Sequence, residues 1–132
     1  MLLLEYKEII QALKALYSAK ELLLKVYSQV KDGRYVALFV QEDLATAWYR
    51  VNVCRLFTET DVNFEGHLQS SMGLIVDAKE MVGSLAAWGK GVTRAGQANI
   101  LTALIQSGDE IFTAIELLES MLNVSSSSCK EF

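Results

Sequence analysis

The residues best suited to catalysis or metal binding in this sequence are a single histidine, His67, and two cysteines, Cys54 and Cys129. No Glu stands three residues before His67, so the Glu-x-x-His motif of carboxylate-bridged metal sites is missing. No Cys-x-x-Cys pair or His/Cys cluster has the spacing of a zinc site. We therefore interpret His67 as a packed, hydrogen-bonded residue and Cys54 as a small hydrophobe. The sequence predicts no catalytic residue, no metal and no cofactor, and the chain is not expected to be an enzyme.

The elements that must position every candidate site are long helices. Proline is absent, hydrophobic residues make up 52% of the 132 residues, and charged residues make up 21%. Helical periodicity of apolar residues runs through most of the chain. It predicts helices over residues 2–31, 35–58, 62–88 and 94–123.

Short connections between these helices make consecutive helices antiparallel neighbours. Asp32-Gly33 and Gly89-Lys90-Gly91 are expected to end helices, while Thr60 or Asp61 and Thr93 are expected to cap the starts of the next ones. The sequence thus predicts an all-α, antiparallel up-down four-helix bundle over residues 1–124. The serine-rich segment 125–132 is predicted to be a flexible tail.

One segment has a second interpretation. Residues 35–40 are rich in aromatic and β-branched side chains and also fit a β-strand. Because no other segment alternates cleanly enough to pair with a strand, we favour a helix there.

A polar level is predicted halfway along the bundle. If the helices fold back on one another, Lys20, Asp43, Lys79 and Gly108 fall at about one height, each on or beside an apolar line. A lysine in an apolar core is costly unless it is paired, so a Lys20–Asp43 contact is expected, with Lys79 nearby. The level could simply fix the register of the helices, or the lysines could extend to the rim. Alternatively, it forms a small ligand pocket in which Gly108 provides room.

The first two predicted helices have more apolar surface than one core needs. In residues 2–31 the apolar arc covers over half of the circumference, and residues 35–58 carry apolar lines on two opposite sides. A soluble monomer rarely exposes such a patch. We therefore predict an interface that includes Leu22, Val26, Leu38, Tyr49 and Leu56. The alternative is a splayed bundle in which these two helices sit centrally.

Charge and targeting signals narrow the function classes. The net charge of −4 argues against nucleic acid as the main partner, and residues 1–58 carry +2 whereas residues 59–132 carry −6. The leucine run at the N-terminus breaks at Glu5, too early for a secretion signal, and no apolar run spans a membrane. A cytoplasmic location is therefore expected.

These features favour a non-catalytic helical interaction module that self-associates and binds or blocks another protein, as an adaptor, inhibitor or immunity-type protein. The alternative is a small-ligand sensor or carrier that uses the mid-bundle polar level of Lys20, Asp43 and Lys79.

Overall fold

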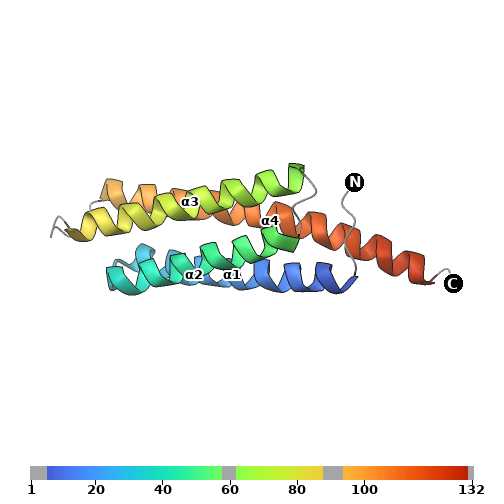
Figure 1. Ribbon diagram of the computed structural model, residues 1–132. Coiled ribbons are helices and arrows are strands. Elements are labelled where there is room, and N and C mark those ends of the chain that lie inside the picture. Colours follow the sequence, from blue (N-terminus) through green and yellow to red (C-terminus); the bar gives the residue numbers. More distant parts are fainter. Residues whose placement is uncertain (1–5, 58–61, 88–93, 131–132) are drawn as a thin grey trace.

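The described residues of the chain form four α-helices that run alternately in opposite directions. The computed structural model describes residues 6–57, 62–87 and 94–130, with side chains described over 6–56, 62–84 and 95–123. The helices are α1 (Tyr6–Asp32), α2 (Ala37–Phe57), α3 (Val62–Ala87) and α4 (Arg94–Lys130). Figure 1 shows each helix returning along its predecessor. The predicted all-α four-helix bundle is confirmed.

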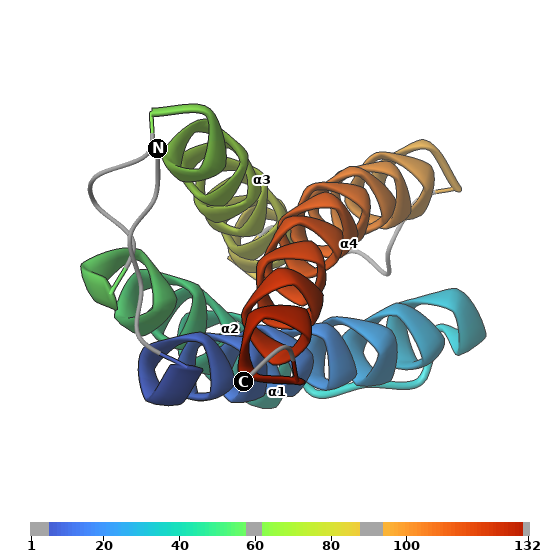
Figure 2. The ribbon, with the colours of Figure 1, turned by 90° about the vertical axis from the view of Figure 1, so that its right-hand side faces the viewer.

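The helices form two layers of two. Helices α1 and α2 make one layer and α3 and α4 the other, as the end-on view of Figure 2 shows. Each helix packs against two neighbours: α1 against α2 and α4, and α3 against α2 and α4. Within the described residues the diagonal pairs α1/α3 and α2/α4 do not approach closely. This arrangement determines which side chains can meet.

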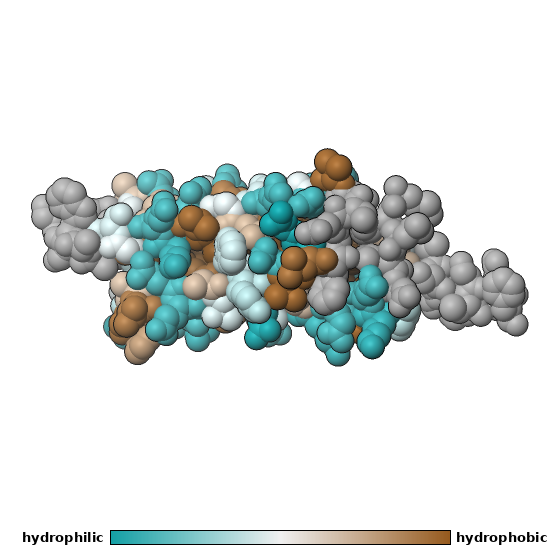
Figure 3. Space-filling view, in the orientation of Figure 1, coloured by the Kyte–Doolittle hydropathy of each residue, from teal (hydrophilic) through white to brown (hydrophobic). Residues whose placement is uncertain are grey.

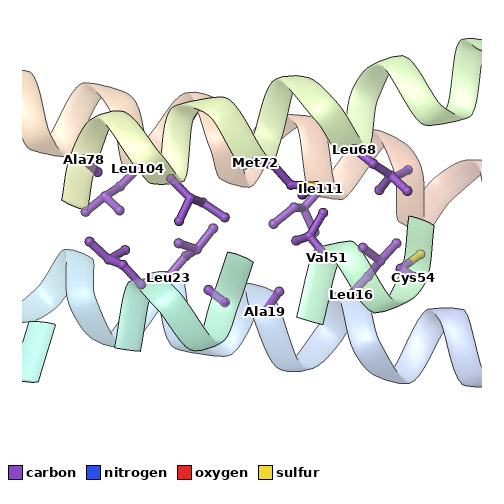
Figure 4. Close-up of a cluster of buried hydrophobic side chains, with 14 of the residues drawn as sticks. Leu16, Ala19, Leu23, Val51, Cys54, Leu68, Met72, Ala78, Leu104 and Ile111 are labelled. Carbon is purple, nitrogen blue, oxygen red and sulfur yellow. The ribbon is translucent and has the colours of Figure 1, made fainter. Parts of the chain in front are cut away.

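Each helix contributes to the core a line of side chains at alternating three- and four-residue spacing, the pattern of coiled-coil packing. Figure 4 shows such side chains from all four helices meeting between the layers. On α2 one of the two opposite apolar lines expected from the sequence is buried, and it consists of Val40, Leu44, Ala47, Val51 and Cys54. On α3 it is Phe64, Leu68, Ser71, Ile75, Ala78 and Val82, and on α4 it is Ile100, Leu104, Ser107, Ile111, Ala114 and Leu118.

On α1 the core line leaves out Lys20, the lysine predicted at the polar level. The fully buried residues include Ala19 and Val26, so the line passes beside Lys20 and not through it. The prediction that Val26 belongs to an external interface was therefore wrong, because its side chain is 0% exposed. The physical reason is the wide apolar arc of α1. Two adjacent lines are both apolar enough to be buried, and packing against α2 and α4 selects between them.

The turn after α1 has the expected glycine. Gly33 adopts a left-handed conformation with φ of +70°, which L side chains rarely adopt, and its N–H donates to the Val30 carbonyl at 3.1 Å. The Gln97 side chain of α4 adds two hydrogen bonds, with Nε2 2.7 Å from the Val30 oxygen and 2.9 Å from the Lys31 oxygen. The start of α4 therefore satisfies carbonyls at the end of α1.

The other helix ends either differ from the predicted ones or lie outside the described residues. The strand interpretation of residues 35–40 was wrong, since α2 begins at Ala37. Helix α4 continues to Lys130, past its predicted end near residue 123 (Figure 1). The proposed caps at Thr60, Asp61 and Thr93 and the stop at residues 89–91 lie outside the described residues. The flexibility predicted for residues 125–132 stays a prediction.

Candidate functional site

A surface groove runs between α1 and α4, and we call it the α1/α4 groove. It has a volume of about 330 Å³. Both helices contribute apolar side chains to its walls. Several of these side chains are about half exposed to solvent: Leu24 is 58% exposed, Ile105 50% and Phe112 48%. The remaining lining residues are Lys20, Leu23 and Tyr27 of α1 and Leu104, Gly108 and Asp109 of α4. A groove of this composition suits an apolar occupant with a few polar groups.

Lys20 is the cation of the groove. Its Nζ lies 5.3 Å from the centroid of the Phe112 ring, a cation–π geometry that contributes about 0.5–1 kcal/mol at an exposed site. The ion pairs among the described residues join Lys25 to Asp43, Arg55 to Glu65, and His67 to Glu110. Lys20 therefore has no carboxylate partner in the described part of the chain.

Gly108 opens the groove on the α4 side. A Cβ built on this residue would have no neighbouring atom within 4 Å. The glycine is therefore not required for a close approach of helices. Its missing side chain leaves space in the groove opposite the Lys20 side of α1.

The predicted polar level does not form as a single cluster. Asp43 pairs with Lys25 at 3.1 Å, so the predicted Lys20–Asp43 contact was wrong. Lys79 is exposed on α3, which is diagonal to α1, and its carbonyl accepts a hydrogen bond from Gln41 of α2 at 3.3 Å. Because α1 is rotated to bury Ala19, Lys20 faces α4 and Lys25 faces α2. Of the four residues predicted for this level, Lys20 and Gly108 come together in the groove.

A second apolar surface lies on the side of α2 that faces away from the core. Leu38 is 60% exposed, Tyr49 57% and Leu56 65%. At 100° per residue these side chains lie opposite the buried line of α2, together with exposed Glu42 and Ala45. We call Leu38, Glu42, Ala45, Tyr49 and Leu56 the α2 outer stripe. Figure 3, in which α2 and α3 lie toward the viewer, shows apolar side chains alternating with hydrophilic ones on this face.

The remaining residue of the predicted interface, Leu22, is partly buried and packs against the core. The structure therefore leaves Leu38, Tyr49 and Leu56 exposed, but not Val26, and it places Leu22 at an intermediate position.

Sequence reasoning missed a buried polar contact between α3 and α4. Ser71 and Ser107 are both 0% exposed, and their hydroxyl oxygens lie 2.8 Å apart. Ser107 Oγ also donates to the carbonyl of Ser71 at 3.1 Å, so both hydroxyls are satisfied within the chain. The sequence does contain a signal for this contact. Ser71 and Ser107 each occupy a position in the three- and four-residue spacing of buried residues in their helix, and Ser107 directly precedes Gly108.

His67 lies one turn from Ser71 and is hydrogen-bonded. Its Nδ1 is 2.6 Å from Glu110 Oε2, and both side chains are about one-third exposed. Within the described residues no group of three or more His, Cys, Asp or Glu side chains could hold a metal ion. Burial raises the pKa of the Cys54 thiol to about 12, which keeps it protonated at neutral pH.

A hydrogen bond joins α1 and α4 beyond the Lys20 end of the groove. The hydroxyl of Tyr17 donates to the Glu119 carboxylate, and this bond, with a smaller contribution from desolvation, raises the pKa of Tyr17. Tyr17 is 43% exposed and is not among the residues that line the groove.

Comparison with known proteins gives no relative: no protein-family model, curated protein sequence or solved structure matches this chain. Within the described residues, no helix combines the length and the apolar character needed to cross a membrane. The chain is thus described by its own structure, as a four-helix bundle with an apolar groove on one side and an apolar stripe on another.

Proposed function

We propose that this chain is a non-catalytic helical interaction module that self-associates and, in that state, holds or blocks another protein. One observation carries the proposal. The α2 outer stripe exposes Leu38, Tyr49 and Leu56 by more than half, directly opposite the core line of the same helix. A helix that is apolar on two opposite sides is typical of one buried on both.

Single exposed apolar residues are normal on soluble proteins and need no explanation. The stripe differs because its apolar residues recur on one helical face over the length of α2. Burying such side chains contributes about 25 cal/mol for each Å² removed from water. Association through this face therefore has a physical driving force, and the exposed Tyr49 adds the aromatic character common in interfaces.

The test is the solution mass of the protein across a hundredfold concentration range, measured by light scattering. We expect a mass above that of one chain, and Leu56→Glu or Leu38→Glu should lower it because each buries a charge in the interface. Val76→Glu is the matched control: Val76 is 38% exposed on α3, outside the stripe and the groove. Unmodified protein that stays a single chain at every concentration would overturn the proposal.

A small-ligand carrier is the second candidate, and the α1/α4 groove is the observation that favours it. The groove combines apolar walls with Lys20, which suits a small apolar anion. Asp43 and Lys79 are not part of it. The probe is 8-anilinonaphthalene-1-sulfonate: this candidate expects saturable fluorescence that Lys20→Met weakens. Equal fluorescence with both proteins would contradict it.

A further inference from the structure

We infer that the α2 outer stripe of one copy docks into the α1/α4 groove of a second copy, with the Glu42 carboxylate against the Lys20 ammonium. The inference rests on the proposed self-association and names the surface that receives the stripe. The two surfaces have complementary shapes, because the α2 outer stripe is a ridge along one helix and the α1/α4 groove lies between two helices.

The charges on the two surfaces are also complementary. Glu42 is exposed, and it is the one charged residue of the stripe, between Leu38 and the Ala45–Tyr49 segment. The ion pairs of the described residues do not include Glu42, just as they do not include Lys20. Each apolar surface thus carries a charge that its own described chain leaves without an oppositely charged partner, and the two charges have opposite sign.

The spacing of the groups supports the same docking. Along α1 the groove runs from Lys20 to Tyr27, which is about 10 Å at 1.5 Å per residue. Glu42 and Tyr49 are separated by the same number of residues on α2 and so by about the same distance. With Glu42 at Lys20, the small Ala45 lies over the middle of the groove, where Gly108 leaves open space.

The groove also holds a carboxylate, Asp109, on its α4 side. Because Lys20 lies over Phe112, Asp109 falls on α4 between Gly108, at the middle of the groove, and the end at which Glu42 docks. Glu42 therefore meets Lys20 on the α1 side of the groove, across from Asp109 on the α4 side.

The arrangement of the two surfaces determines the kind of assembly. The stripe lies on α2, whereas the groove lies between α1 and α4, so the contact joins two different surfaces. Contacts of this type extend into open chains or close into rings, in contrast to a two-fold dimer in which the same patch meets itself. The average mass should therefore increase with concentration beyond that of a dimer.

Charge reversal tests the pairing directly. In Lys20→Glu the groove becomes acidic and meets Glu42, and in Glu42→Lys the stripe becomes basic and meets Lys20. Each variant alone should associate at least about tenfold more weakly than the unmodified protein, because like charges oppose each other in the contact. In an equimolar mixture each stripe finds a groove of opposite charge, and association should return. Lys14→Glu is the control, since Lys14 is exposed on α1 outside the groove.

The outcomes separate this inference from the proposed function. Restored association in the mixture, with each variant alone associating at least about tenfold more weakly than the unmodified protein, supports the docking. Association of Lys20→Glu as strong as that of the unmodified protein would overturn it, while leaving self-association through α2 intact. If the unmodified protein is a single chain throughout, both fail. Circular dichroism melts of each variant establish that the single substitutions leave the bundle folded.

Discussion

Helix α4 has two neighbours, and its contacts with them differ in kind. Toward α3, polar side chains of α4 find partners within the same chain. Ser107 bonds to Ser71, with both side chains fully buried, and Glu110 pairs with His67. Toward α1 it leaves a groove with half-exposed apolar walls, in which Lys20 is stacked on a ring and has no carboxylate partner among the described residues.

The difference shows which surface is complete within one copy. Between α3 and α4 each buried hydroxyl has its partner, so another molecule would gain little by displacing it. Between α1 and α4 both apolar area and a charge remain for an occupant to cover. The same helix therefore completes its polar contacts on the α3 side and leaves the α1 side open for the docking that we propose.

The largest expected difference compares two isoleucines on α4. Ile111 is 0% exposed in the core and Ile105 is 50% exposed in the groove. Ile111→Ala should lower the free energy of unfolding by about 2–5 kcal/mol, through lost burial and a cavity. Ile105→Ala should cost about 0.5 kcal/mol, because water already covers half of the side chain and alanine favours the helix. Urea denaturation measures both, and equal losses would contradict the comparison.

The next effect concerns the buried serines. Ser107→Ala removes the donor to the Ser71 carbonyl and leaves the Ser71 hydroxyl without its partner, at a cost of about 1–2 kcal/mol. The double variant Ser71→Ala/Ser107→Ala should cost less than the sum of the two single variants, because no hydroxyl is then left unpaired. Strict additivity in urea denaturation would show that the hydroxyls do not depend on each other.

Replacing the glycine of the groove should raise the free energy of unfolding, in contrast to the substitutions above. A Cβ at Gly108 meets nothing within 4 Å, so Gly108→Ala should stabilise the chain by about 0.5–1 kcal/mol. Gly73→Ala is the matched control, since Gly73 lies on α3 with the same open surroundings and should gain a similar amount. Only the Gly108 variant narrows the groove, so it alone should weaken self-association. Equal association of both variants would separate the groove from the interface.

The smallest effect is expected for the two lysines of α1. Lys20→Met removes an exposed cation–π contact but keeps an apolar chain in the groove, so the unfolding free energy should change by under about 0.5 kcal/mol. Lys25→Met breaks the pair with Asp43, and solvent screening limits that loss to about 0.2–1 kcal/mol. Measurements at low protein concentration, where single chains predominate, avoid a contribution from association. A loss of several kcal/mol for Lys20→Met would mean that the lysine supports the core.

The residues that face the core could be predicted from the sequence more accurately for α2 than for α1. On α2 the apolar residues fall into two lines on opposite sides. Leu38, Tyr49 and Leu56 were predicted to face outward, and the opposite line, Val40 to Cys54, is the buried one. On α1 the two apolar lines are adjacent, so a rotation by a few tens of degrees exchanges Lys20 for Ala19 at the core. Spacing alone cannot choose between adjacent lines, which is why the predicted Lys20–Asp43 pair was wrong.

The candidate site was predictable to the same degree. Leu38, Tyr49 and Leu56 followed from the second apolar line of α2, and Lys20 and Gly108 were selected as residues at one height. A small pocket with room provided by Gly108 was one alternative in the sequence analysis, but its walls were not predicted, because they depend on how α1 is rotated beside α4. The buried serines were missed although they occupy core positions in the spacing, because serine is mostly found at exposed positions.

By itself the sequence determined the helices, their short connections and the left-handed glycine that ends α1, because these depend on interactions within a few residues. The tertiary structure decided how each helix rotates, which helices are neighbours and therefore which side chains meet. Those choices depend on packing between residues far apart in the chain. The free energy of that packing belongs to the facing surfaces together, and neither helix specifies it alone.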